Sequence, residues 1–113
     1  MTESLVDQTV ISELIEATGE EFAEELVMTF LEEAPQIIES LKAAAIAADA
    51  DGYRRAAHSI KSNAYTFGAT ALAELARNIE AGSLPDGGDV SDATMLEAEF
   101  QKAAEALRDL FDE

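Results

Sequence analysis

The residue best suited to chemistry in this sequence is His58, the only histidine in the chain. A neutral imidazole is a competent nucleophile near pH 7. If the surrounding segment is helical, Lys61 lies one turn after His58 and Arg54 one turn before it, on the same face. Both cations could then pair with the oxygens of a phosphoryl group carried on the ring. Taken alone, a histidine on a helix is most often an ordinary surface residue.

The pattern around His58 also predicts which way the imidazole points. Apolar residues recur at helical spacing and mark a buried stripe: Tyr53, Ala57, Ile60, Ala64 and Phe67. With His58 at zero and about 100° per residue, this stripe lies on the opposite side of the helix. Four residues lie within about 60° of the histidine: Arg54, Lys61, Ser62 and Tyr65. We therefore expect an exposed imidazole, which a partner could approach closely over the small Ser62.

Charge is distributed unevenly along the chain. The formal net charge is −17, which argues against nucleic-acid binding because a phosphate backbone would be repelled. Acidic faces also keep small domains soluble, and that is an ordinary reason for such a total. The segment from Tyr53 to Arg77 differs, because it is net +3, with one acid, Glu74, and four basic residues, Arg54, Arg55, Lys61 and Arg77. This local patch is expected to meet something negative.

The rest of the sequence is patterned almost entirely for helices. A short amphipathic helix is expected from about Asp7 to Gly19, and Thr18 with Glu21 resembles a capping box that starts a second helix. Pro35 is expected to kink this second helix without breaking it. Its apolar stripe comprises Ala23, Val27, Phe30, Ala34, Ile37, Leu41 and Ala45.

The second half of the chain predicts three more helices. A turn at residues 49–52 leads to the helix of His58, from about Gly52 to Phe67, which Gly68 can close in the left-handed conformation. Thr70 is a candidate cap for the next helix, residues 82–88 form a loop, and Ser91 opens the last helix. We therefore predict an all-α fold, an up-down four-helix bundle with a short extra N-terminal helix, as a single domain over residues 1–113.

Composition limits the compartment and the chemistry. The chain has no cysteine, which fits a reducing compartment. The first residues show no signal peptide, and no apolar run approaches the ~20 residues of a membrane span. We therefore expect a cytoplasmic protein without membrane contact, and we expect a monomer because one bundle accounts for the apolar stripes. The sequence has neither a Glu-x-x-His metal pattern nor a GxxxxGK[ST] phosphate loop, so we expect no metal site and no self-phosphorylation from ATP.

The segment from Ala57 to Ala69 reads AHSIKSNAYTFGA and resembles the signature of the histidine-phosphotransfer (HPt) family of bacterial phosphorelays. In that family the phospho-accepting histidine is followed by an apolar residue at +2, lysine at +3, small residues at +4 to +6, and Gly-Ala at +10 and +11. The matching positions here are Ile60, Lys61, Ser62, Asn63, Ala64, Gly68 and Ala69. Position +4 is often glycine in the family, and Ser62 is a small variant of it.

The likeness covers about Asp7 to Asp109, with further matches at Phe30–Pro35, Leu72 and Leu75. It implies that His58 shuttles a phosphoryl group between aspartates of receiver domains, or from a hybrid histidine kinase to a response regulator, and that Lys61 stabilises its charge. The residues expected to bind these partners are Arg54, Arg55, Ser62, Tyr65 and Gly68. The chain itself would be a stoichiometric phosphocarrier without a cofactor and not an enzyme, with Mg²⁺ bound only in the receiver domain.

Two other functions are compatible with the residues. One is a helical adaptor that binds a receiver or kinase domain without carrying phosphate, although the intact His58 and Lys61 argue against it. The other is an acidic mimic of nucleic acid, which would use a broad acidic face and would be indifferent to His58→Gln.

Overall fold

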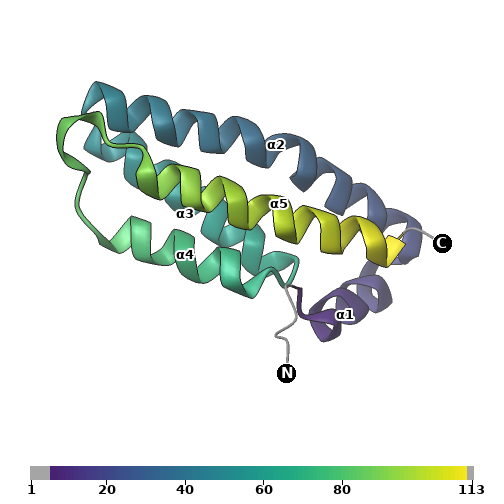
Figure 1. Cartoon of the computed structure of the whole chain (residues 1–113). Coiled ribbons are helices and arrows are strands. Elements are labelled where there is room, and N and C mark those ends of the chain that lie inside the picture. Colours follow the sequence, from purple (N-terminus) through teal and green to yellow (C-terminus); the bar gives the residue numbers. More distant parts are fainter. Residues whose placement is uncertain (1–5, 112–113) are drawn as a thin grey trace.

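The computed structural model describes residues 6–111, and this range contains helices but no strand (Figure 1). The helices are α1 (Gln8–Thr18), α2 (Glu20–Ala47), α3 (Ala50–Thr66), α4 (Thr70–Ala81) and α5 (Ser91–Phe111), with a short 3-10 turn, η1 (Asp86–Gly88), before the last. The predicted all-α fold with an extra N-terminal helix is confirmed. Within the described range, no helix is both long and apolar enough to cross a membrane.

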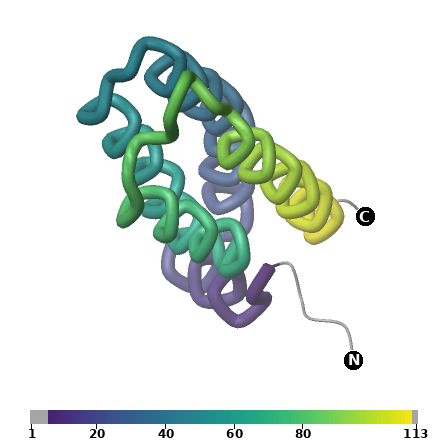
Figure 2. Tube along the Cα trace, turned by 60° about the vertical axis from the view of Figure 1, so that its left-hand side comes forward, coloured from purple at the N-terminus to yellow at the C-terminus, as the bar shows by residue number. Residues whose placement is uncertain are grey.

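Helices α2 to α5 form an up-down bundle in which consecutive helices run antiparallel (Figures 1 and 2). Helix α3 packs between α2 and α4, and α5 completes the bundle by packing against α4 and α2. The short α1 packs against α2, at the end of the bundle where α3 turns into α4. The η1 turn lies at the opposite end, against the last turn of α2. The outer face of α3 is therefore left open between α2 and α4.

The predicted apolar stripes form the core, with one exception. Every residue of the α3 stripe is buried. In α2, Ile38 fills the core position expected for Ile37, which is only partly buried. At the α1 end of the bundle, the ring of Phe30 stacks on Phe67 at a centroid distance of 5.1 Å and meets the edge of Phe100 at 5.7 Å. These ring contacts hold α2, the end of α3 and α5 together.

Two helix caps differ from the sequence prediction. Thr18 is the last residue of α1, and its hydroxyl donates to the Leu14 carbonyl at 2.8 Å. The capping box with Glu21 does not form, because α1 continues through Thr18 and a hydroxyl inside a helix bonds back to its own preceding turn. Thr70 is likewise already helical, and Ala69 holds the N-cap position of α4 without a side-chain hydrogen bond.

The connection between α2 and α3 is tighter than the turn expected at residues 49–52. Ala48 ends α2 in the left-handed conformation, with φ of 58°. Asp49 then caps α3, since its Oδ1 accepts from the Gly52 N–H at 3.0 Å. Three of the four expected turn residues are therefore helical. Further back, Pro35 lies within α2, which continues without a break on both sides.

The turn from α3 to α4 depends on Gly68, which adopts the predicted positive φ, at 73°. Its carbonyl accepts from the Asp7 N–H at 2.7 Å. A Cβ at this position would lie 2.8 Å from the Asp7 carbonyl oxygen and 3.1 Å from the Val10 side chain. Gly68 thus serves two needs, a left-handed backbone and close approach to the start of α1.

We expect Gly68→Ala to lower the free energy of unfolding by about 2–4 kcal/mol, from the left-handed backbone and the clash with Asp7 together. Gly87→Ala is the matched control, because Gly87 also has a positive φ of 65° but nothing lies within 4 Å of its Cβ position. This control should lose only about 1–2 kcal/mol. Urea unfolding followed by helical circular dichroism measures both values. Equal losses would contradict the contact with α1.

Candidate functional site

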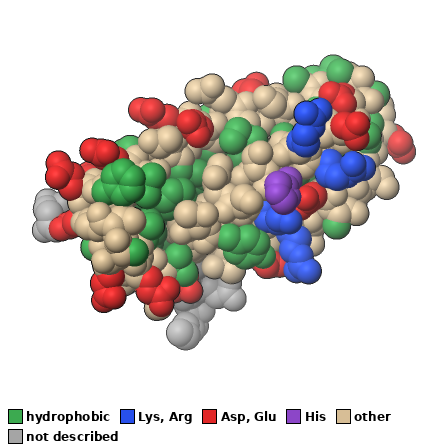
Figure 3. Space-filling view, turned by 180° about the vertical axis from the view of Figure 1, so that it is seen from behind, with side chains coloured by type: hydrophobic (Ala, Val, Ile, Leu, Met, Phe, Trp, Pro, Cys, Tyr) green, Lys and Arg blue, Asp and Glu red, His purple; other side chains and the backbone are tan. Residues whose placement is uncertain are grey.

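His58 projects from the outer face of α3, as the helical pattern predicts. Its side chain is 57% exposed, while Ala57 and Ile60 beside it are completely buried in the bundle. The surface view shows several lysine and arginine side chains near the histidine, with an acidic side chain beside it, on a molecule that is otherwise rich in carboxylates (Figure 3). Because the neighbours on the inner side fix α3 in the core, the histidine is held at a defined place on the surface.

The imidazole is held by a carboxylate from the adjacent helix. Nδ1 of His58 lies 2.8 Å from Oε2 of Glu80 on α4. A carboxylate can only accept a hydrogen bond, so Nδ1 must carry the proton. In a neutral ring the lone pair then resides on Nε2, which has no hydrogen-bond partner among the residues that the structure describes. The arrangement leaves Nε2 as the free nucleophilic atom of the site.

Glu80 also binds the cation that follows His58. Its Oε1 lies 2.6 Å from Nζ of Lys61, and both side chains are mostly covered, with 21% and 24% of their surface exposed. The hydrogen bond from Lys61, and after it the one from His58, lowers the pKa of the Glu80 carboxyl, although desolvation acts in the opposite direction. Glu80 is therefore ionised at neutral pH and bridges the two residues that the sequence singled out.

The arginines near His58 differ in how strongly they are paired. Arg54 forms an ion pair with Asp51 at 3.6 Å. Arg55 donates from Nε to the Asp51 backbone carbonyl at 3.4 Å, and no carboxylate of the described residues pairs with it. Both arginines line an open hollow together with Asp51, His58 and Glu80. An anion that entered this hollow would lie next to the imidazole and to two guanidinium groups.

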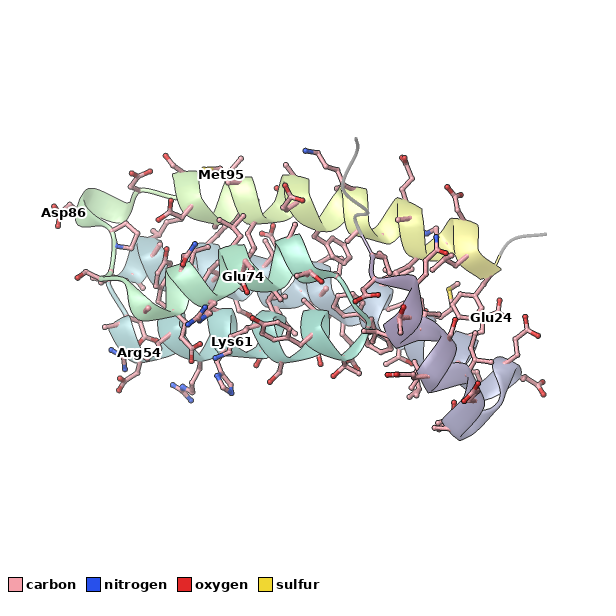
Figure 4. All side chains as sticks on the ribbon, turned by 90° about the horizontal axis from the view of Figure 1, so that it is seen from below. Glu24, Arg54, Lys61, Glu74, Asp86 and Met95 are labelled. Atoms are coloured by element: carbon pink, nitrogen blue, oxygen red, sulfur yellow. The ribbon has the colours of Figure 1, made fainter. Side chains whose placement is uncertain are left out.

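The count of basic residues overstates the positive charge of this patch. Lys61 is paired with Glu80, and Arg77 with Glu74 at 3.6 Å. Figure 4 shows Arg54 and Lys61 on α3 and Glu74 on the adjacent α4. Glu80 reaches Lys61 from the adjacent helix, whereas Asp51 and Glu74 each pair with an arginine three residues later on their own helix. The patch is therefore a network of paired charges, in which Arg55 is the guanidinium without an ion pair.

The other predicted partner-binding residues occupy different environments. Ser62 is exposed one turn beyond His58. Tyr65 is 45% exposed, and its hydroxyl donates to Glu74 at 2.8 Å, which raises the pKa of that hydroxyl. Gly68 is buried beneath the start of α1. Its expected contact with a partner does not fit this burial, because α1 covers the position, so Gly68 supports the site through the turn that it forms.

Glu80 is the functional residue that the sequence prediction missed. On its own helix it follows the buried Ile79, and the nearest cation on α4, Arg77, is paired with Glu74. The antiparallel hairpin of α3 and α4 brings it to His58, and the same hairpin brings Glu74 to Tyr65. Both pairs are placed almost symmetrically about the turn at Gly68. An antiparallel alignment of the residues of α3 and α4 about this glycine would have identified both partners.

A family model and a solved structure match this chain. The model of the Hpt domain matches residues 25–111. The chain is similar to the crystal structure of histidine-containing phosphotransfer protein B (HptB) from Pseudomonas aeruginosa PAO1, with 28% sequence identity and a TM-score of 0.75, over 97% of this chain and 93% of that chain. No curated protein sequence matches it. Since the Hpt model spans most of the chain and includes the helix of His58, this protein belongs to the Hpt domain family, the histidine phosphotransfer proteins of two-component systems.

Proposed function

We propose that this chain carries a phosphoryl group on Nε2 of His58, taking it from an aspartate of one receiver domain and giving it to an aspartate of another. The observation that carries the proposal is the orientation of the imidazole. Glu80 holds Nδ1 at 2.8 Å, so the lone pair of Nε2 faces outward. A partner can reach this atom from solvent without any movement of the bundle.

The chemical step follows from this orientation. The lone pair of Nε2 attacks the phosphorus of an aspartyl phosphate, an N–P bond forms, and the P–O bond to the aspartate breaks. The released electron pair stays on the aspartate carboxylate. His58 then holds a positive ring whose Nδ1 proton is bound by Glu80. In the reverse direction, an aspartate of the second receiver attacks the phosphorus and the electron pair returns to Nε2.

The surrounding cations suit a transferring phosphoryl group. Lys61 lies one turn from His58, and Arg54 and Arg55 line the hollow beside the ring. These groups would offset the charge spread over the phosphoryl oxygens. The magnesium ion of the reaction belongs to the receiver domain in this proposal, as the family likeness implies. Among the described residues, no cluster of three or more His, Cys, Asp or Glu side chains could hold a metal.

The proposal makes the chain a stoichiometric carrier that depends on its partners for catalysis. Its partners would be a sensor or hybrid histidine kinase and a response-regulator receiver domain, bound in turn by a cytoplasmic monomer. The exposed Ser62 is small enough to let a receiver approach His58 closely. Tyr65 lies two turns along the same face, within the radius of an ordinary protein interface centred on the histidine.

The first test is phosphoryl transfer from a radiolabelled receiver domain to the wild type and to His58→Gln. The wild type should acquire label that is lost in acid and kept in base, and the variant should acquire none, because it lacks the nucleophilic nitrogen. Binding of the same receiver is measured by calorimetry for both proteins. If every receiver of the same cell leaves the wild type unlabelled while one of them binds it, the chain is an adaptor.

Lys61→Ala should slow transfer from the receiver by about 10- to 100-fold, because one cation is lost beside the transferring group. Lys102→Ala is the matched control, since Lys102 is an exposed lysine on α5 whose one ion pair among the described residues is with Glu99 at 3.8 Å. Single-turnover rates at saturating receiver separate this effect from weaker binding. Similar rates for both variants would remove Lys61 from the reaction.

A further inference from the structure

The bridging position of Glu80 has consequences for the phosphorylated state of His58. In the unphosphorylated chain, its Oε2 lies 2.8 Å from Nδ1 of His58 and its Oε1 lies 2.6 Å from Nζ of Lys61. A phosphoryl group on Nε2 brings additional negative charge to the other side of the same ring. Only the imidazole separates the two anions, so they lie within the screening distance of about 8 Å at physiological ionic strength.

Most of the cations near the ring already have carboxylate partners, so they are not free to offset this repulsion. Lys61 is already bound to Glu80 and must be shared with the phosphoryl oxygens or move to them. On α3, Arg54 is paired with Asp51, and on α4, Arg77 is paired with Glu74. Arg55 is thus the one nearby cation of the described residues that has no carboxylate partner. Glu80 therefore competes with the phosphoryl group for positive charge.

Glu80 also acts on the bond that must break. When the N–P bond breaks, its electron pair goes to Nε2. If Nδ1 carries a proton, the leaving group is a neutral imidazole, and without that proton it would be an imidazolate anion, a much poorer leaving group. A carboxylate on Nδ1 keeps the proton there. Repulsion and protonation thus act in the same direction, and both favour departure of the phosphoryl group.

We propose that Glu80 shortens the lifetime of the phosphoryl group on His58 and so favours its transfer onward. The proposal rests on the proposed function, because it concerns the same phosphohistidine. It assigns Glu80 as a positioning residue, which acts through the ring and through Lys61 and forms no bond to phosphorus. In the unphosphorylated chain it directs Nε2 outward, and in the phosphorylated chain it favours release of the phosphoryl group over its retention on His58.

The test measures the lifetime of phospho-His58 without any receiver domain. Phosphoramidate, a small phosphoryl donor, labels wild type, Glu80→Gln and Glu74→Gln, and the donor is then removed. Phosphorus NMR follows hydrolysis, in which water forms a P–O bond, the N–P bond breaks, and inorganic phosphate is released. Glu74→Gln is the matched control, because it removes the same charge from the same helix but contacts Tyr65 and Arg77 instead of His58.

Glu80→Gln should lengthen the lifetime by about threefold or more, while Glu74→Gln should stay close to wild type. Nitrogen NMR of the unphosphorylated ring should show a loss of the Nδ1–H tautomer in Glu80→Gln, an effect that a purely structural role would not produce. Thermal unfolding confirms that each variant is folded, and Glu80→Ala serves as a second variant. With a receiver present, Glu80→Gln should retain a larger share of the phosphoryl group at equilibrium.

An unchanged or shorter lifetime in Glu80→Gln would overturn the proposal, because Glu80 would then be neutral toward the phosphorylated ring or stabilise it. Equal lengthening in Glu74→Gln would also overturn it, since the effect would come from net charge alone. Failure of phosphoramidate to label the wild type would show that Nε2 is not a free nucleophile. The two lifetime outcomes are distinct from failure of the proposed function, in which the lifetimes differ as expected but no receiver exchanges a phosphoryl group.

Discussion

The reversal of the chain at Gly68 is the constraint on which the site depends. Its positive φ of 73° and its lack of a side chain let α3 turn into α4 directly beneath the start of α1. This turn sets the register of the two antiparallel helices, because it fixes which residues of α4 lie opposite which residues of α3. With the register as it is, Glu80 reaches His58, and Glu74 reaches Tyr65. The site is therefore built by a backbone feature that lies far from the chemistry.

The sequence predicts well what is local to one helix. Helical spacing alone placed His58 opposite the buried stripe of α3, and the same pattern gave the bundle its helices and its loops. The prediction failed for Ile37 and Ile38, since both lie near the edge of the α2 stripe and only packing against a neighbour decides which one is buried. The caps at Thr18 and Thr70 failed for a related reason. A serine or threonine can cap a helix or lie inside it. Because the connections before α2 and α4 are short, Thr18 and Thr70 both lie inside a helix.

The bridging Glu80 could not be derived from its own helix, because its importance comes from the register of α4 against α3. Counting charges along the chain likewise described Lys61 and the arginines as a free basic patch. Pairing with Glu80 across helices, and with Asp51 and Glu74 within α3 and α4, changes that description. Lys61, Arg54 and Arg77 each have a carboxylate partner. Charge along a sequence is thus a guide to where cations gather, and the three-dimensional pairing decides how much of their field reaches a ligand.

A phosphocarrier must satisfy two opposite requirements, because the group that it accepts must also leave. A histidine surrounded only by cations would stabilise the phosphoryl group and hold it. The site around His58 instead combines one cation, Lys61, with one anion, Glu80, and places both within hydrogen-bonding distance of each other. In the proposed function, the cation would offset the charge of the transferring group, and the anion would keep the ring protonated on Nδ1 and oppose accumulated negative charge. The same Glu80 carboxylate contacts both Lys61 and the ring of His58. A substitution of this one residue on α4 can therefore change the balance between acceptance and release, while α3, which carries His58, stays the same.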